Sequence, residues 1–545
     1  MADTPAPGKV RLVNEGDNLQ KAIDEAKCGD TLKLQAGVTF SGLFRLPSKP
    51  CDDAHWIIIR TSAPDDALPP EGTRINPCYG GVSSLPGRPE FHCSAAHTVL
   101  PKIEFDARSI SGPFIFLPGA NHYRLLGLEI TRGKPEFHMR NLVQTQDDAA
   151  ADHIIFDRLW LHGGPQDETK AGIHLSGMTN AAVVDSYFND FKCIAREGSC
   201  TDAQAVNGGS GRNATGPLKI VDNFLEAAGE CIMFGGAAAT ITPTDIEIRR
   251  NHLFKPMIWK PGESGFVGTP TGAPFIIKNH FELKNAQRVL FENNLLENVW
   301  GGFSQAGFSI LLTPNNPAGN MCPDCRVTDV TIRYNKVSHV GGALQFANFA
   351  SRGGMFATAG ERYSIHDLVV SDIDPQKFKG FGSFLLLMSA APLLKDIYID
   401  HVTAFPPNVL ISISSSVNRP KIPNFKVTNS IFTAGRRQIT SAGGRDNCAF
   451  QPEMQGPEGV LKSCFENWQF TRNIVIDAGG HWPKDNLLLH NEGDAGIVRS
   501  ETGYRLCQEK GGDCKKVSPA LHAGTDGRDL GADISRIEKD LAGVE

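Results

Sequence analysis

A short phrase with an asparagine at a fixed place recurs along this chain, and it limits the possible folds more than any other feature. Its clear copies are KIVDNFLE (219–226), EIRRNHLF (247–254), LFENNLLE (290–297) and TIRYNKVS (331–338). Looser copies surround Arg158, Ser186, Asp372, Asp400, Asn429 and Asn473, and successive equivalents lie 28, 37, 28, 43, 41, 37, 28, 29 and 44 residues apart. A minimum of 28 residues with variable additions indicates a coil of constant size that carries side loops.

The apolar alternation before each asparagine predicts a strand with one buried face. Asparagine tolerates the left-handed backbone conformation, so we expect it to mark a bend between two strands. Side chains of such asparagines in successive coils can hydrogen-bond to one another as a ladder. A β-sandwich or a β-propeller would not place asparagine at one fixed phase. The sequence therefore predicts an all-β fold, a right-handed parallel β-helix that forms a single domain over residues 1–545.

The two ends of the chain fit this fold. Apolar residues at helical spacing predict a helix over residues 17–27, which would cap the open end of the first coil. The coils are expected over about residues 30–515. Residues 516–545 would then close the other end of the solenoid, because an uncovered last coil exposes unpaired backbone.

Charge and cysteine content restrict the function and the compartment. Sixty acidic against 54 basic residues give a net charge of -6, which argues against a nucleic-acid-coating protein. No apolar run is long enough to span a membrane. Four close pairs of cysteines predict disulfides and an oxidising compartment, so we expect a secreted or periplasmic protein with its leader removed, acting as a monomer. The predicted pairs are Cys193 with Cys200, Cys322 with Cys325, Cys448 with Cys464, and Cys507 with Cys514; Cys51, Cys78 and Cys93 cluster near the N-terminus, and Cys28 or Cys231 is expected to be free.

The opening segment, the asparagine coils and the closing phrase HAGTDGRDLGADI (522–534) together resemble the pectate-lyase-like superfamily of β-helix proteins. The opening resembles polysaccharide lyases such as alginate lyases and chondroitinase B. The stretch FELKNAQRVLFENN (281–294) is similar to bacterial secreted β-helix proteins described mainly by that repeat. The resemblance implies a polysaccharide as the partner molecule. It allows Ca²⁺ as a cofactor, since such lyases often use it to neutralise a substrate carboxylate.

A second strand precedes each asparagine bend and predicts a column of polar side chains. These strands are expected at 172–176, 230–234, 281–285, 308–312 and 343–347, with their apolar alternates turned into the coil. His174, Glu282, Lys284 and Gln345 would face outward, with Glu230 at the start of its strand. Coils stack about 4.8 Å apart, so these side chains would share one face.

This column supports two kinds of chemistry. Glu230 and Glu282, one coil apart, could form the carboxylate pair of a retaining glycoside hydrolase. Alternatively, Lys284 could take the proton next to a uronate carboxylate, with Arg250 or Lys255 neutralising that carboxylate. Lys284 matches the base of the alginate and chondroitin lyases, although no ArgHisGly segment follows it as it does in them. The AspAsp pair and GlyHisGly segment of pectin hydrolases are also absent.

Three long insertions, 196–216, 256–276 and 299–326, are expected to wall a groove beside this column. We expect His174, His252, Lys255, Trp259, Trp300, Gln305 and Gln345 to contact the substrate, the two tryptophans by stacking on sugar rings. A further insertion, 436–466, carries Cys448 and Cys464 and is interpreted as a stapled structural loop. The favoured function is a lyase acting on a uronate-containing glycan. The alternatives are a hydrolase using the glutamate pair and a glycan-binding or adhesive β-helix without catalysis, in which outward charges are simply solvated.

Overall fold

The computed structural model describes residues 3–91, 93, 96–105, 111–133, 138–302, 305–348, 353–390, 392–450, 456–500 and 503–545. The chain divides into two compact units, Met1–Ile276 and Ile277–Glu545, which are described separately below. The single domain over residues 1–545 stays a prediction.

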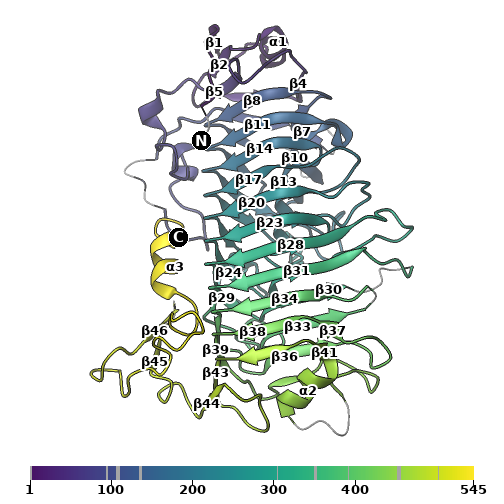
Figure 1. Ribbon diagram of the computed structural model, residues 1–545. Helices are drawn as coiled ribbons and strands as arrows, with labels where there is room; N and C mark the ends of the chain where they lie inside the picture. Colours follow the sequence, from purple (N-terminus) through teal and green to yellow (C-terminus); the bar gives the residue numbers. More distant parts are fainter. Residues whose placement is uncertain are drawn as a thin grey trace. The chain divides into compact units, whose positions relative to one another are not determined.

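The N-terminal unit consists of coils with three strands each, and equivalent strands of successive coils pair in parallel into sheets A, B and C. Figure 1 shows β8, β11, β14 and β17 of sheet A stacked in this way. Sheet A contains β1 Val10–Val13, β2 Thr31–Leu34, β5 Ile57–Thr61, β8 Asn121–Leu126, β11 Ala151–Asp157, β14 Met178–Val184, β17 Leu218–Val221 and β20 Thr244–Arg249. Sheet B contains β3 Thr39–Ser41, β6 Lys102–Phe105, β9 Glu129–Arg132, β12 Trp160–His162, β15 Tyr187–Phe191, β18 Phe224–Ala227 and β21 His252–Phe254. Sheet C contains β4 Phe44–Leu46, β7 Ser111–Phe116, β10 Met139–Thr145, β13 Thr169–His174, β16 Gln204–Gly208 and β19 Glu230–Phe234.

The C-terminal unit repeats the same three-strand coil. Its sheet A contains β23 Ala286–Glu292, β28 Arg326–Arg333, β31 Ala359–His366, β34 Lys395–Asp400, β38 Phe425–Thr428 and β42 Gln469–Thr471. Its sheet B contains β24 Leu295–Val299, β29 Lys336–Val340, β32 Val369–Val370, β35 Thr403–Ala404, β39 Ile431–Thr433, β43 Ile474–Ile476 and β44 Leu487–Leu489. Its sheet C contains β22 Phe281–Leu283, β27 Phe308–Leu312, β30 Gly342–Asn348, β33 Ser383–Ser389, β36 Val409–Ser414 and β40 Ile439–Ser441.

Short elements lie outside these sheets. They are β25 Gly301–Gly302, β26 Gln305–Ala306, β37 Ile422–Pro423, β41 Phe465–Glu466, β45 Ile497–Ser500, β46 Gly503–Leu506, the helices α1 Leu19–Glu25, α2 Gly456–Cys464 and α3 Ile534–Leu541, and the 3₁₀ turns η1 Asp65–Ala67, η2 Pro77–Tyr79, η3 Gln146–Asp148 and η4 Met257–Trp259. Each unit is therefore a right-handed parallel β-helix, and the predicted fold class is confirmed. Among the described residues, no helix has the length and apolar character needed to cross a membrane.

The asparagine ladder forms as predicted, but the bend is made by a different residue. Asn223 donates from Nδ2 to Oδ1 of Asn251 at 2.9 Å, and Asn294 donates in the same way to Asn335 at 3.0 Å. The left-handed conformation belongs to the residue before each ladder position, as in Asp222 with a φ of 57°. The expectation that the ladder asparagine itself takes this conformation is wrong. Its side chain instead turns into the coil and forms hydrogen bonds with the buried backbone groups of the bend.

The predicted ends and disulfides are also largely as expected. Helix α1 lies within the predicted range 17–27, and Asn18 caps its N-terminus by accepting a hydrogen bond from the Lys21 N–H. In the C-terminal unit, residues from 520 to 544 pack with coil residues in one apolar cluster. The four predicted disulfides are present, together with Cys28–Cys51 and Cys78–Cys93. Cys28 is therefore not free, whereas the buried Cys231 is.

Candidate functional site

The outer face of sheet C in the N-terminal unit carries a hydrogen-bonded column centred on His174. His174 stands opposite Asn207 of the next coil, and its Nδ1 lies 2.6 Å from Asn207 Oδ1. Its Nε2 lies 2.9 Å from Asp148 Oδ1, and Ser210 donates to the other oxygen of Asp148 at 2.8 Å. The hydrogen bond from His174 is the main cause that lowers the pKa of Asp148. The outward placement predicted for His174 is confirmed, and its ring is held by neighbours on both sides.

Glu230 belongs to the same column but is sealed from solvent. Its Oε2 accepts from Gln204 Nε2 at 2.8 Å, and Gln204 Oε1 accepts from Asn207 Nδ2 at 2.7 Å. The exposed fraction of Glu230 is 0%, so the expectation of an accessible carboxylate is wrong. Its role in this structure is to hold the amide side chains of the column in position.

Two further predicted residues, Arg250 and His252, lie away from this face. Arg250 follows β20 at the bend between sheets A and B, and its charge helps to lower the pKa of Asp222, which burial raises on balance. His252 lies in sheet B, is 1% exposed and packs edge-on to Phe224 and Phe254. Because Glu230 stands in sheet C, the N-terminal unit does not bring these residues together with it.

Lys255 is a structural residue rather than a substrate contact. Its Nζ donates to the backbone carbonyls of Ala227 at 2.7 Å and Gly229 at 2.5 Å, and burial lowers the pKa of the amine. These bonds fasten the turn that leads from sheet B into sheet C. Lys255 is 0% exposed, so its predicted contact with a substrate carboxylate is wrong, whereas that of Arg250 stays a prediction.

The two predicted stacking tryptophans are buried. Trp259, 1% exposed, packs edge-on to Phe275, and the ammonium of Lys192 lies 5.3 Å from the centre of its ring. Trp300 is 2% exposed. Neither indole can stack on a bound sugar in this structure. Gln305 is half-buried in the short hairpin of β25 and β26.

The C-terminal unit keeps Lys284 and Glu282 together on the sheet C side. Lys284 Nζ lies 3.4 Å from Glu282 Oε1, and Thr313 donates to the same oxygen at 2.7 Å. Glu282 is 3% exposed, so its predicted outward exposure is wrong, whereas 23% of the Lys284 side chain remains accessible. Gln345 stands two strands further along the same face and is half-buried. Of these two ionisable side chains, Lys284 is therefore the one that a ligand can reach.

One large hollow of the C-terminal unit was not predicted. A groove of about 1000 Å³ lies over β33, β36 and β40 of sheet C. Arg436, Arg437 and Arg445 line it, together with the exposed rings of Phe381 and Phe450. None of its described lining residues is acidic. Within the described part of the chain, none of the three guanidinium groups forms an ion pair, so their charge is free to bind an anion.

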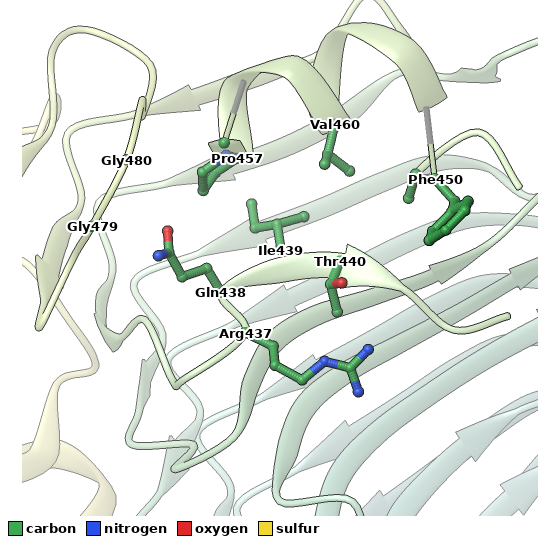
Figure 2. Close-up of a pocket in the computed structure, with 11 residues that line it drawn as sticks. Arg437, Gln438, Ile439, Thr440, Phe450, Pro457, Val460, Gly479 and Gly480 are labelled. Carbon is green, nitrogen blue, oxygen red and sulfur yellow. The ribbon is translucent and has the colours of Figure 1, made fainter. Parts of the chain in front are cut away.

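A smaller hollow of about 550 Å³ shares Arg437 and Phe450 with the groove. Figure 2 shows Ile439 between Arg437 and helix α2, whose Val460 faces it. The insertion 436–466 is indeed closed by the Cys448–Cys464 disulfide, but it also supplies all three arginines that line the groove. The interpretation of this insertion as a structural loop did not predict the groove. The adjacent arginines and Phe450 are the sequence features that could have indicated it.

The use of Ca²⁺ that the resemblance allows stays a prediction. Three or more possible ligands among His, Cys, Asp and Glu come together at two described places, Asp53/His122/His153 and His138/Glu168/Cys200. Each contains one carboxylate, whereas Ca²⁺ takes six to eight oxygen ligands. Cys200 is moreover bonded to Cys193.

Among the comparisons with known proteins, the search of solved structures gave matches. No family model matches the chain, and no curated protein matches it. Similar solved structures include an alginate lyase from Paenibacillus sp. str. FPU-7, at 13% identity over 75% of this chain and 94% of that one with a TM-score of 0.35. A PL6 family polysaccharide lyase from Pseudopedobacter saltans matches at 13% identity over 88% and 93%, with a TM-score of 0.45. A mannuronic acid specific family 6 lyase from human gut microbiota matches at 10% identity over 89% and 92%, with a TM-score of 0.48. At these identities and TM-scores the matches carry no argument about activity, and the assignment of the fold rests on the strand pairing described above.

Proposed function

We propose that this protein binds a uronate-containing polysaccharide along sheet C of its C-terminal unit and cleaves it by β-elimination. The observation that carries the proposal is the groove with three exposed arginines and no acidic lining residue among those described. Arginine presents a planar set of donors that matches a carboxylate, so successive uronates of a chain suit such a wall. Phe381 and Phe450 add flat apolar surfaces against which sugar rings can pack.

Lys284 is the proposed base. In its neutral form Nζ would take the proton from the carbon next to the uronate carboxylate. The electron pair left behind forms a carbon–carbon double bond, the bond to the leaving glycosidic oxygen breaks, and that oxygen accepts a proton. Glu282, 3.4 Å away and held by Thr313, would stabilise the ammonium formed on Lys284. The same ammonium can then return its proton to the leaving oxygen.

The position of the groove relative to Lys284 suggests a polymeric substrate. Strands β27 and β30 lie between β22, which Lys284 follows, and β33, the first strand of the groove. Three strand spacings correspond to about 14 Å. A ligand that fills the groove and also reaches Lys284 must therefore extend over several sugar residues.

A second candidate function is glycan binding without catalysis. It is favoured by the groove itself, whose described lining residues include arginines as their only ionisable groups and so no general base. The hydrolase alternative requires Glu230 and Glu282 to act as a pair. Both carboxylates are buried and they belong to different units, so that alternative stays a prediction.

The six disulfides are typical of proteins that fold in an oxidising compartment. We therefore propose that the protein is secreted or periplasmic, where extracellular polysaccharides are accessible. Its monomeric state stays a prediction.

Incubation of the purified chain with a panel of polyuronates and neutral glycans tests the proposal. Ultraviolet absorbance of unsaturated uronates and the release of reducing ends are followed in parallel. A rise of both on a polyuronate supports elimination. New reducing ends without that absorbance indicate hydrolysis and overturn the proposed chemistry. Binding to a polyuronate with neither signal indicates the non-catalytic alternative.

A further inference from the structure

Two histidine rings and one carboxylate converge at the edge of sheet A in the N-terminal unit. His122 of β8 and His153 of β11 occupy equivalent positions in successive coils, and their rings stack 4.5 Å apart at 6°. Asp53 Oδ1 lies 3.1 Å from His122 Nε2 and 3.6 Å from His153 Nε2. This group plays no part in the function proposed above.

The backbone presents both rings in the same unusual way. His122 and His153 have φ angles of 54° and 53°, in the left-handed region that few non-glycine residues adopt. The indole of Trp56 packs edge-on to both rings, 5.1 and 6.1 Å from their centres. The two imidazoles are therefore held face to face by the coil and by one aromatic wall.

A second layer of hydrogen bonds orients each ring. His122 Nδ1 lies 2.9 Å from Asn121 Oδ1, and His153 Nδ1 lies 2.7 Å from Asp152 Oδ2. Asp152 is itself fixed, because its other oxygen accepts a hydrogen bond from Thr179 at 2.6 Å. Oxygen acceptors at Nδ1 place the ring hydrogen there. This is the arrangement that metal-binding histidines use to present the lone pair of Nε2 to an ion.

The consequence is a group of neighbouring acceptors. With hydrogen on both Nδ1 atoms, both Nε2 atoms and the Asp53 carboxylate can accept, and these atoms all lie within 4.8 Å of one another. A cation bound there would interact with all three acceptors at once. We propose that Asp53, His122 and His153 bind a divalent transition-metal ion, for which Zn²⁺ is the best match.

The dimensions suit zinc. Zinc bonds to histidine nitrogen and carboxylate oxygen are about 2.0–2.2 Å long, which places neighbouring ligand atoms of a tetrahedral site about 3.3 Å apart. The observed separations of 3.1 and 3.6 Å from Asp53 Oδ1 lie on either side of that value. Imidazole ligands favour zinc over calcium and magnesium. The Asp53 side chain is 88% exposed, so water can supply the fourth ligand.

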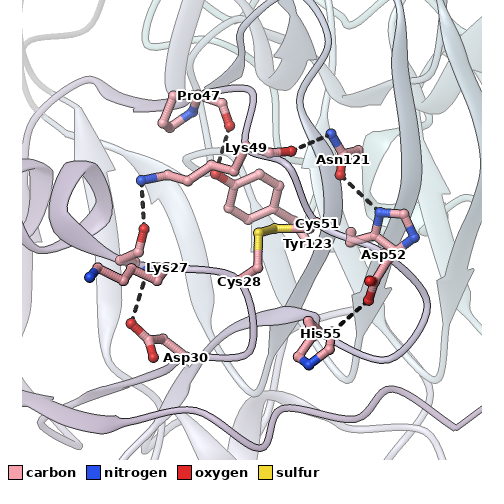
Figure 3. Close-up of a disulfide and its surroundings, with 12 residues drawn as sticks. Lys27, Cys28, Asp30, Pro47, Lys49, Cys51, Asp52, His55, Asn121 and Tyr123 are labelled. Atoms are coloured by element: carbon pink, nitrogen blue, oxygen red, sulfur yellow. Dashed lines mark hydrogen bonds and ion pairs between the residues drawn. A yellow bond between two sulfur atoms is a disulfide. The ribbon is translucent and has the colours of Figure 1, made fainter.

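The ion would fasten a surface loop to the coils. Asp53 follows Cys51, whose disulfide to Cys28 anchors the loop, and Figure 3 shows this disulfide beside the contact between Asp52 and His55. Asn121 and Tyr123 of β8 already hold this loop through the carbonyls of Lys49 and Pro47, and the ion would add a contact at Asp53. Metal binding therefore contributes to the stability of the N-terminal unit.

Zinc titration of the intact, disulfide-bonded chain, freed of metal by a chelator, tests this site. Calorimetry is expected to give one Zn²⁺ per chain, and added Zn²⁺ is expected to raise the unfolding temperature in a concentration-dependent way. His153→Asn, which keeps a residue that tolerates the left-handed conformation, should weaken Zn²⁺ binding more than about tenfold. Asp53→Asn, on an exposed side chain that cannot disturb folding, should also weaken it.

His339→Asn is the matched control. His339 also has a left-handed φ of 58° and lies 3.8 Å from a single carboxylate, that of Asp372. This variant should bind Zn²⁺ like the parent chain. Equal affinities for the parent, His153→Asn and Asp53→Asn would overturn the proposed site, as would the absence of a stoichiometric zinc in the parent. The glycan assay does not depend on this result, so the two proposals fail independently.

Discussion

Asn251 Oδ1 accepts two hydrogen bonds from Asn223, one from the side-chain Nδ2 at 2.9 Å and one from the backbone N–H at 3.0 Å. Both residues are fully buried. Asn251→Ala would leave the Asn223 backbone N–H and one Nδ2 hydrogen without a partner inside the coil, while Nδ2 still donates to the Val183 carbonyl at 3.0 Å. We expect a loss of about 2–4 kcal/mol in the free energy of unfolding, measured by urea denaturation, since each buried unsatisfied group costs about 1–3 kcal/mol. Asn418→Ala, on an exposed turn, should change it by less than about 0.5 kcal/mol.

The coils could be predicted because the sequence patterns that define them are local. Alternation with period two correctly placed Ile232 and Phe281 inside, and asparagine at constant phase correctly gave the ladder. The surroundings of the sheets could not be predicted in this way, because they depend on contacts between distant segments. Arg88, for example, reaches Glu226 across 138 residues, and no periodic pattern encodes that contact.

The exposure of the candidate site residues could not be predicted for the same reason. Period two correctly assigned His174 to the outer face of sheet C, but an outer face is exposed only where no other segment covers it. Glu230 and Glu282 are covered, and the indole of Trp259 is turned into a packed loop. The arginine groove, in contrast, comes from an insertion whose close cysteine pair suggested a merely structural loop.

Asp185 should make stability depend on pH. Burial raises its pKa from 3.8 to about 6, although the Gly72 N–H donates to it at 2.7 Å. The folded state therefore holds this proton more tightly than the unfolded chain, and stability falls as pH rises from about 4 through 6. Asp185→Asn removes this loss. We expect the variant to be more stable than the parent by up to about 3 kcal/mol at pH 7, with little difference at pH 4.

Denaturation of both proteins over pH 4–8 measures this effect. Asn suits the site because it tolerates the φ of 53° found at Asp185 and can still accept from Gly72. Asp477→Asn, at an exposed aspartate with a φ of 56°, is the control and should show no such pH trend. A stability difference for Asp185→Asn that is constant over the pH range would contradict the assignment.

Arg88 holds a surface loop through a buried ion pair. Its guanidinium donates to both oxygens of Glu226, at 2.7 and 2.8 Å, and to Asp190 at 3.0 Å. Arg88→Met would leave the fully buried Glu226 without its countercharge, which is expected to cost about 3–5 kcal/mol in unfolding free energy. Adding Glu226→Gln to this variant should recover part of the loss, because the unpaired charge is then absent. Arg11→Ala breaks a half-exposed pair with Glu25 and should cost less than about 1 kcal/mol.

Arg437 is the best single test of glycan binding, because it lines both the groove and the adjoining hollow. Arg437→Ala should weaken polyuronate binding by about 10- to 100-fold without changing stability, since the side chain is exposed and a charge-assisted hydrogen bond contributes about 1.5–3 kcal/mol. The loss should shrink as salt is added. Arg419→Ala, at an exposed arginine that does not line the groove, should bind as the parent does. Equal affinities for the two variants would remove the groove from the proposal.

Lys284 separates catalysis from electrostatic binding. Lys284→Ala should lower the rate of polyuronate cleavage by about 10²-fold or more, since a positioned base contributes about 10²- to 10⁴-fold. Lys284→Arg keeps a positive charge beside Glu282, but a guanidinium does not give up its proton and so cannot act as a base. If Lys284 is the base, the Arg variant should be as inactive as the Ala variant while binding the polymer normally. Activity restored by Arg would show that the residue only neutralises charge. Lys219→Ala, at an exposed lysine on β17, controls for the removal of a lysine and should cleave at the parent rate.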